Sequence, residues 1–268
     1  MINLGVHASK KNIVKYASYT NIFQVFLSTP YRMNLTGHYD ETLFMQYPEA
    51  HFVIHGPYWT NFQVENRFLR QTVRLIRQHL EFCERHGIRY VVFHTGTQNR
   101  KIKEGKKLIP FSKEFVVDLL LPIVRNYPKV TMLLENSPSH RGKGMSVDKI
   151  INVVDDVRAK GVSNIGLCLD TLHAYAYGEN MDRMSYFMKF ADVIHFNSFP
   201  EEVGHGSCRD RHSETPLQDS KAFSPTLLIS WLKIYVQKYK ILEMRTEAAL
   251  ATFKWLSRIF NDEGKKNN

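Results

Sequence analysis

The sequence contains no long hydrophobic run and little cysteine. No stretch of its 268 residues approaches about 18 consecutive apolar residues, so no transmembrane helix is predicted. The three cysteines, Cys83, Cys168 and Cys208, are an odd number without metal-type spacing, which favours free thiols over a disulfide framework. Residues 1–6 are typical of a first strand and not of a signal peptide. We therefore expect an intracellular protein in a reducing compartment, the cytoplasm or the nucleus.

The sequence also lacks internal repeats, low-complexity segments and a linker rich in Pro, Gly or Ser. This predicts one domain over residues 1–260, followed by a polar tail at residues 261–268. No Gly-rich phosphate loop follows the first apolar segment, which disfavours a dinucleotide-binding open sheet. No G-x-S-x-G motif is present, and no cysteine is set beside a histidine. The sequence therefore shows no candidate for a side-chain nucleophile.

Short apolar segments alternate with longer amphipathic ones, as in the βαβ units of a parallel sheet. The predicted strands are 2–6, 22–27, 52–54, 90–93, 130–134, 165–169, 193–194 and 241–242. The clearest predicted helices are 64–85, 112–125, 147–158, 224–238 and 246–260. Ser224 and Pro225 are typical of an N-cap and a first helical position. Eight strands separated by helices predict an α/β fold, a single (β/α)8 TIM barrel, with a doubly wound open sheet as the main alternative.

Six of these strands run directly into a histidine or a carboxylate. The residues that follow them, in chain order, are His55, His94, Glu135, Asp170, His195 and Glu243. In a TIM barrel all these positions lie on the C-terminal rim of the strands, where active sites are built. Structural histidines and carboxylates do not collect on one rim without a reason, so we expect the functional site there.

Two further groups belong with this rim. His173 follows Asp170 by three residues, and Asp210 and His212 form a D-x-H pair on the long loop after the seventh strand. Taken singly, Asp170 and His173 are equally well explained as a capping carboxylate and a packed imidazole, and the D-x-H pair is better explained as part of a solvated charged loop. Together the candidates comprise five imidazoles and four carboxylates, more than the three or four ligands of one tetrahedral zinc. They suit a cluster of two or three divalent ions.

The other histidines are interpreted differently. His7 also closes a strand, but a hydrogen bond near the barrel mouth explains it as well as metal ligation does, and it is not included among the ligands. The remaining ones fall on loops or helices without ligand-type neighbours, where surface or packing roles are expected: His38, His51, His79, His86, His140 and His205.

The net charge of +10 favours a polyanionic partner such as nucleic acid. Basic residues gather in the loops after the fourth, fifth and seventh strands: Arg100, Lys101, Lys103, Lys106, Lys107, Arg141, Lys143, Arg209 and Arg211. Such runs are usually solvated surface, but here they flank the expected metal ligands. Tyr58 and Trp59, just after His55, are explained either by loop packing or as a wedge that replaces a missing base in kinked DNA.

The candidate residues lie in an ordered set of short motifs. These are G-V-H-A-S at the start, H-G-P-Y at His55, F-H-T-G-T at His94, L-E-N at Glu135, C-L-D-T-L-H-A-Y at Asp170, H-F-N at His195, D-R-H-S at Asp210 and L-E at Glu243. The set resembles the endonuclease IV family, metal-dependent apurinic/apyrimidinic (AP) endonucleases built on a TIM barrel. The family pattern has a Gly-Gly pair where residues 9–12 read S-K-K-N, and a Gly-rich segment where residues 213–218 read S-E-T-P-L-Q.

The resemblance implies a trinuclear zinc site. His55, His94 and Glu135 would hold the first ion. Glu135, implied as the catalytic residue, would bridge to a second ion held by Asp170, His195 and Glu243. His173, Asp210 and His212 would hold the third. Some family members use manganese or iron in part of the site.

The resemblance also implies an enzyme of base-excision DNA repair that acts on double-stranded DNA with abasic sites. A hydroxide formed at the clustered metals would cut the phosphodiester 5′ to the abasic site, leaving a 3′-hydroxyl and a 5′-deoxyribose phosphate, and would trim blocked 3′ ends. The DNA contacts it implies are Arg32, Tyr58, Trp59 and Arg211. We expect a monomer that does not associate with membranes.

Two other functions stay open. The rim residues Glu135, Asp170, His195 and Glu243 are by themselves the ligand set of a mononuclear sugar isomerase or epimerase on a related barrel. That enzyme would have no use for the other five candidates. A non-catalytic DNA-binding protein on the same scaffold would be expected to have lost ligands, whereas none is lost here.

Overall fold

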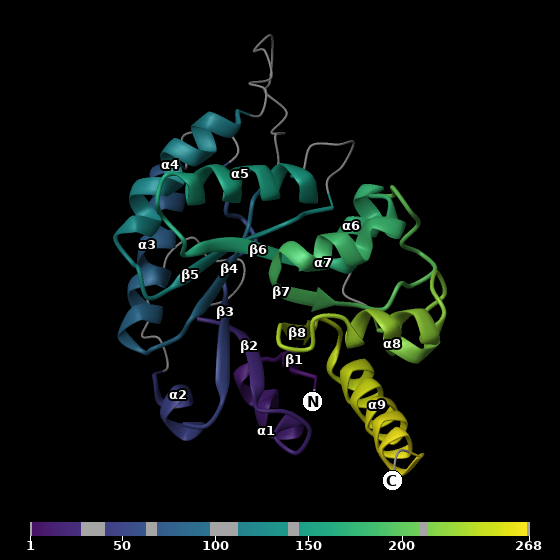
Figure 1. The fold of residues 1–268 in the computed structure, drawn as a ribbon. Helices are drawn as coiled ribbons and strands as arrows, with labels where there is room; N and C mark the ends of the chain where they lie inside the picture. Colours follow the sequence, from purple (N-terminus) through teal and green to yellow (C-terminus); the bar gives the residue numbers. More distant parts are fainter. Residues whose placement is uncertain are drawn as a thin grey trace.

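The computed structural model describes residues 2–27, 41–62, 69–96, 112–138, 145–208 and 214–266, apart from the side chains of 261–266. Eight parallel strands close into a barrel in chain order, with β8 hydrogen-bonded to β1. This confirms the predicted TIM barrel and excludes the open sheet. The helices lie around the barrel (Figure 1). The strands are β1 (Leu4–His7), β2 (Ile22–Phe26), β3 (His51–His55), β4 (Tyr90–His94), β5 (Thr131–Glu135), β6 (Ile165–Asp170), β7 (Ala191–Phe196) and β8 (Tyr239–Leu242).

The helices are α1 (Ile13–Tyr16), α2 (Thr42–Gln46), α3 (Leu69–Arg85), α4 (Lys113–Arg125), α5 (Val147–Ala159), α6 (Thr171–Tyr177), α7 (Met184–Phe190), α8 (Pro225–Lys233) and α9 (Thr246–Lys266). Short 3-10 helices are η1 (Lys10–Asn12), η2 (Met181–Arg183) and η3 (Leu217–Asp219). The predicted helix start at Ser224 is confirmed, because its hydroxyl accepts from Leu227 N at 3.3 Å and Pro225 is the first helical residue.

A layer of apolar side chains fills the barrel just below its C-terminal rim. Successive strand residues point to opposite faces, so the residue two positions after an inward-pointing one also points inward. The inward residues that pack together in this layer are Ile22, Val53, Val92, Leu133, Cys168, Val193 and Ile241. Two positions after each of them stand, in the same order, Gln24, His55, His94, Glu135, Asp170, His195 and Glu243. The strand period therefore aims all the predicted rim residues, and Gln24, into the barrel mouth.

In β1 the residue at the level of this apolar layer is a glycine. Gly5 lies two residues before His7, and a Cβ atom on Gly5 would lie 2.5 Å from Cγ2 of Ile22. The apolar layer therefore has no room for a side chain at this position. Gly5 allows β1 to approach β2 closely, and the ladder between the two strands pairs His7 with Gln24. His7 is thus a rim residue as well.

The strand ladders reach further toward the rim than the sequence predicts. Residues His55, His94, Glu135 and Asp170 are the last residues of their strands and not the first residues of loops. Ladder pairs join His94 to Glu135 and Asp170 to His195. Backbone hydrogen bonding at these positions fixes the direction of each side chain. The candidate ligands therefore stand on the rigid part of the barrel.

Strand β7 differs most from its predicted range of residues 193–194, because it begins at Ala191. Asp192 is the extra residue where the ladder with β6 shifts register between Leu167 and Cys168. Its Oδ2 accepts from Leu167 N at 3.3 Å and occupies the place that a Cβ atom on Gly166 would need. Gly166 therefore makes room for the Asp192 carboxylate.

Two helix ends also differ from the prediction. Helix α8 stops at Lys233, short of residue 238, because Ile234 is extended and Tyr235 adopts a left-handed conformation with φ of 49°. Lys240 Nζ donates to Tyr235 O at 2.9 Å across this turn. Helix α9 continues past residue 260 to Lys266, so most of the expected tail is helical backbone. The first residues of predicted helix 64–85 lie outside the described part of the chain.

All three cysteines carry free thiols, as predicted. Burial raises the pKa of Cys168 to about 12, and it raises the pKa of buried Cys83 as well. Both thiols therefore stay protonated and serve in packing and not as nucleophiles. Within the described ranges no helix has the length and apolar character needed to cross a membrane.

We expect Leu133→Ala to lower the free energy of unfolding by about 2–5 kcal/mol, because it opens a cavity in the closed barrel interior. Leu227→Ala is the matched control, since Leu227 is 38% exposed on α8, and its effect should stay below about 0.5 kcal/mol. Urea denaturation of both variants measures the difference. Equal effects would contradict the place of Leu133 beneath the rim.

Candidate metal centre

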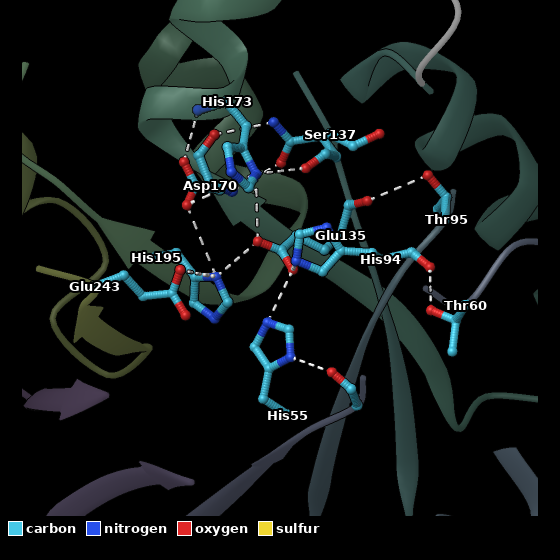
Figure 2. A network of polar contacts seen from close by, with 12 residues as sticks. His55, Thr60, His94, Thr95, Glu135, Ser137, Asp170, His173, His195 and Glu243 are labelled. Carbon is cyan, nitrogen blue, oxygen red and sulfur yellow. Dashed lines mark hydrogen bonds and ion pairs between the residues drawn. The ribbon is translucent and has the colours of Figure 1, made fainter. Parts of the chain in front are cut away.

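The Glu135 carboxylate lies among four imidazoles at the barrel mouth (Figure 2). Its Oε2 is 3.0 Å from His94 Nε2 and 3.3 Å from His55 Nε2. Its Oε1 is 2.9 Å from His195 Nδ1 and 3.4 Å from His173 Nδ1. Glu135 itself is fully buried. We call His55, His94 and Glu135 the histidine site.

A second group shares Glu135 with the histidine site. Ligand atoms of Glu135, Asp170, His195 and Glu243 all lie within 4.8 Å of one another, and all four residues are buried. His195 Nδ1 is central to the group, 3.3 Å from Glu243 Oε2 and 3.9 Å from Asp170 Oδ2. We call these four residues the carboxylate site. Glu135 therefore belongs to two adjoining sets of possible metal ligands.

The start of α6 positions Asp170 and His173 together. Asp170 is the N-cap of the helix, and its Oδ1 accepts from His173 N at 2.7 Å. Asn136 clamps the Asp170 backbone, because Asp170 N donates to Asn136 Oδ1 at 2.7 Å and Asn136 Nδ2 donates to Asp170 O at 2.9 Å. Asn197 Nδ2 donates to Asp170 Oδ2 at 3.0 Å. The capping role of Asp170 thus leaves Oδ2 facing the carboxylate site.

Burial and neighbouring charge shift the pKa values of Glu135 and Glu243 in opposite directions. Burial raises the pKa of Glu135, but His94 and His195 outweigh it and hold that pKa well below its usual range. Burial also raises the pKa of Glu243, and His195 and His7 bring it well below its usual range. Both groups are therefore buried carboxylates that depend on positive partners for their charge.

The pKa values of Asp170 and His195 are both raised, but for different reasons. Burial raises the pKa of Asp170 to about 6, although His173 opposes the shift. Burial lowers the pKa of His195, but nearby groups that include Glu243 and Glu135 raise it well above its usual value. A proton on His195 therefore supplies positive charge at the point where the ligand atoms of the carboxylate site converge. A divalent ion would supply the same charge at that point.

The hydrogen bonding of His55 tests whether these residues fit a metal ion. Its Nδ1 lies 2.6 Å from Gly56 O, and a carbonyl only accepts, so Nδ1 carries the hydrogen and Nε2 of the neutral ring carries a lone pair. That lone pair faces Glu135 Oε2, which has no hydrogen-bond partner among the described residues. Two facing electron pairs repel each other unless a proton or a metal cation lies between them. The histidine site therefore fits a divalent metal ion.

His173 repeats the arrangement found at His55. Its Nδ1 lies 3.0 Å from Asn136 O, so the hydrogen stands on Nδ1 and the lone pair of the neutral ring on Nε2. A metal-binding imidazole usually donates its other ring N–H to an oxygen acceptor, and that acceptor belongs to the outer layer of the metal site. The group of His55, Glu135 and His195 and the carboxylate site could each hold an ion.

The structure brings together seven of the nine predicted ligands: His55, His94, Glu135, Asp170, His173, His195 and Glu243. The other two, Asp210 and His212, lie outside the described residues. Cys208, just before them, lies against α6, because its N donates to Ala176 O at 2.7 Å. Residues 206–208 therefore run beside α6, the helix that carries His173.

Two of the predicted DNA contacts, Arg32 and Arg211, also lie outside the described residues, as do the basic residues of 100–107, 141–143 and 209. Tyr58 and Trp59 are half-buried just beyond β3. The Tyr58 ring packs edge-on against His55 and His94, with ring centroids 5.7 Å and 5.3 Å apart. The Tyr58 ring therefore forms one side of the histidine site.

Two rim residues, His7 and Gln24, are absent from the predicted ligand set. His7 Nδ1 lies 3.0 Å from Glu243 Oε1, and Gln24 contacts both Glu243 and His195. A signal for Gln24 is present in the sequence, because it is the one polar residue of I-F-Q-V-F and falls in the inward phase of β2. Gln24 would have been found if every inward-facing position of each strand had been considered, and not only the residue at the end of the strand.

Comparison with protein families supports the observed fold. The family model described as xylose isomerase-like TIM barrel matches residues 44–259. A relative from Aquifex aeolicus that is named probable endonuclease 4 is 30% identical over 175 residues, which cover 60% of this chain and 58% of the relative. The chain thus spans less than two thirds of the length of that relative.

Comparison with solved structures gives two similar barrels. Endonuclease IV from Thermus thermophilus matches with a TM-score of 0.72 at 20% identity, over 98% of this chain and 99% of that one. A D-tagatose 3-epimerase-like protein matches with the same TM-score of 0.72 at 18% identity, over 100% of both chains. At these identities the likeness shows the fold alone, so the two activities must be distinguished from the site.

Zinc should raise the melting temperature of the chelator-treated protein by about 5–10 °C, since a ligand at 100 times its Kd contributes about 2.7 kcal/mol to the folded state. We expect His55→Ala to reduce this gain, because it removes one nitrogen of the histidine site. His51→Ala is the matched control, since His51 is the exposed first residue of the same strand. Differential scanning fluorimetry measures both, and an equal zinc response in the two variants would contradict His55 as a ligand.

Proposed function

Because the chain belongs to the xylose isomerase-like TIM barrel family, we propose that it is a metal-dependent AP endonuclease of DNA repair. Its substrate is double-stranded DNA with an abasic site. It hydrolyses the phosphodiester 5′ to that site, leaves a 3′-hydroxyl and a 5′-deoxyribose phosphate, and trims blocked 3′ ends. The name of the Aquifex aeolicus relative supports this proposal, as do the nine candidate ligands.

The main support is that Glu135 has a histidine site in addition to the carboxylate site. A single ion in the carboxylate site would leave Glu135 Oε2 facing His55 Nε2 at 3.3 Å and His94 Nε2 at 3.0 Å with no cation between them. Two imidazole nitrogens and a carboxylate oxygen are a zinc-type ligand set. A second ion next to the first is useful for phosphodiester hydrolysis, where both the attacking and the leaving oxygen need stabilisation.

We assign three zinc ions to the centre, with manganese or iron able to replace zinc in part. The residues of the histidine site would hold the first and those of the carboxylate site would hold the second, and Glu135 is common to both sites. The third belongs to His173, Asp210 and His212, which is supported by the contact of Cys208 with α6. When bound, such ions lower the pKa of water so that hydroxide forms at neutral pH, and they neutralise charge on the leaving oxygen.

The residues of the chain supply the positions of these ligands. The carbonyl oxygens of Gly56 and Asn136 fix the ring hydrogens of His55 and His173 on Nδ1. Asn136 holds the Asp170 backbone in place. Because these ligands stand on strand ends and on the first turn of a helix, little ordering is required when the ions and the substrate bind.

DNA is bound across the same rim, and the net charge of +10 on the whole chain favours a polyanion. Arg32 and Arg211 contact the DNA, and Tyr58 and Trp59 enter the space left by the missing base while the abasic nucleotide is turned out toward the metals. The position of Tyr58, edge-on to His55, supports this arrangement, because an aromatic pair next to the metals can hold a kinked duplex over them.

A mononuclear sugar isomerase or epimerase is the alternative function. It is favoured by the carboxylate site, which is a complete ligand set for one divalent ion. The match to a D-tagatose 3-epimerase-like protein, as good as the match to endonuclease IV, shows that the barrel is compatible with either activity. This alternative assigns no chemical role to His55, His94 or His173.

The purified protein should contain close to three divalent ions per chain and should cut duplex DNA at a single abasic site. Glu135→Gln should slow cleavage by roughly 1,000-fold or more, because loss of the bridging carboxylate removes several kcal/mol of transition-state stabilisation. Glu81→Gln, on the exposed side of α3, is the matched control and should cut at the original rate. Elemental analysis and a gel assay give both numbers. One ion per chain, with sugar turnover and no cleavage, would establish the alternative.

We expect Trp59→Ala to weaken binding to abasic DNA roughly tenfold, the order of one aromatic stacking contact with a base, while the metal content stays the same. Tyr186→Ala is a control for loss of an aromatic ring, since Tyr186 is 47% exposed on α7 and is not one of the predicted DNA contacts. Fluorescence anisotropy with a labelled duplex measures the affinity. An unchanged affinity of the Trp59 variant would remove its role as a wedge.

A further inference from the structure

Gln24 is a fully buried amide at the rim, and it belongs to neither ligand site. Its Nε2 donates to Glu243 Oε1 at 2.5 Å and lies 2.9 Å from His7 Nδ1. Its Oε1 lies 2.7 Å from His195 Nε2. One side chain from β2 therefore joins two ligands of the carboxylate site that come from β7 and from the end of β8.

These contacts fix the orientation of the Gln24 amide. An ionised carboxylate oxygen only accepts, so the amide nitrogen faces Glu243 and the amide oxygen faces His195. An amide oxygen also only accepts, so His195 Nε2 carries a hydrogen and donates it to Gln24. In the neutral ring of His195 the lone pair is then on Nδ1. That nitrogen is the one that faces Glu135 at 2.9 Å and Glu243 at 3.3 Å.

We propose that Gln24 is a positioning residue that sets the ring form of His195 in which Nδ1 can bind a metal ion, and that holds the Glu243 carboxylate next to it. The proposal rests on the metal centre proposed above but not on the reaction. Because Gln24 is fully buried, it cannot touch DNA, and its effect reaches the substrate only through the two ligands. Loss of an outer-layer partner of this kind typically costs 10–100-fold in metal affinity or activity.

An amide has both properties that this position requires. An apolar side chain would remove the acceptor of His195 Nε2 and a donor to Glu243 Oε1. A carboxylate would keep the acceptor for His195, but its second oxygen would face the Glu243 carboxylate, and the two negative charges would repel each other. Gln24→Met and Gln24→Glu therefore separate the two halves of the proposed role while they keep the length of the side chain.

The experiment compares these variants with Asn164→Leu. Asn164 is a partly buried amide that, like Gln24, makes several hydrogen bonds, since its Nδ2 donates to the carbonyl oxygens of Val124, Tyr127 and Val130. It precedes β6, at the end of the barrel opposite the rim, so it controls for general loss of stability. Zinc affinity is measured by competition with a chromophoric chelator, and the ring form of His195 by long-range proton–nitrogen NMR of the zinc-loaded protein.

Gln24→Met should lower the affinity for the most weakly bound zinc by about 10–100-fold and abolish the single Nε2–H form of His195. Gln24→Glu should keep that form and still lose zinc affinity through Glu243. With abasic DNA, both variants should show a reduced kcat and an unchanged KM. Asn164→Leu should lower the melting temperature without changing zinc affinity.

Zinc affinity within twofold of the original protein in Gln24→Glu and Gln24→Met would overturn the proposal. An equal loss of affinity in Asn164→Leu would also overturn it, because the effect would then be one of general stability. If Gln24→Met does not fold, the affinity of Gln24→Glu decides the matter alone. The zinc measurements need no DNA, so a protein that responds as expected but does not cut abasic DNA would refute the proposed function and leave the role of Gln24 intact.

Discussion

The candidate metal centre depends on the burial of three carboxylates, Glu135, Asp170 and Glu243, in one barrel mouth. None of the three is more than 2% exposed. An unpaired buried carboxylate is strongly unfavourable, and three near one another repel as well. Imidazoles, side-chain amides and the first turn of α6 stabilise them in the protein itself. Imidazoles whose lone pairs face carboxylate oxygens indicate that cations complete this balance. A metal centre is therefore the physical reason for a polar mouth on an apolar barrel.

The barrel builds this mouth with the simplest property of a strand, its period of two. The inward apolar layer from Ile22 to Ile241 lies one step below the rim, and each member is followed two residues later by a polar rim residue. The apolar layer supplies the packing, and the rim supplies the chemistry. Since both belong to hydrogen-bonded strands, the distances among ligands from distant parts of the chain are fixed by the sheet and not by loops.

This regularity explains how much could be predicted from the sequence. The barrel and the directions of the six strand-end residues follow from apolar segments that each end in a possible ligand. Gln24 was missed because it lies inside a strand, where the residue after the strand is not informative, and His7 because a hydrogen bond explained it equally well. The early end of α8 was not predictable, because Tyr235 adopts a left-handed conformation that its residue type does not favour, next to a tertiary contact with Lys240.

The carboxylate site alone is compatible with a hydrolase and with an isomerase, whereas the histidine site is accounted for by the second ion of the proposed metal centre. The most direct measurement is a crystal structure of the zinc-loaded protein with anomalous diffraction at the zinc edge. We predict separate anomalous peaks in the histidine site and in the carboxylate site, with the Glu135 carboxylate between them. A single peak in the carboxylate site, with His55 and His94 turned away from Glu135, would contradict this account.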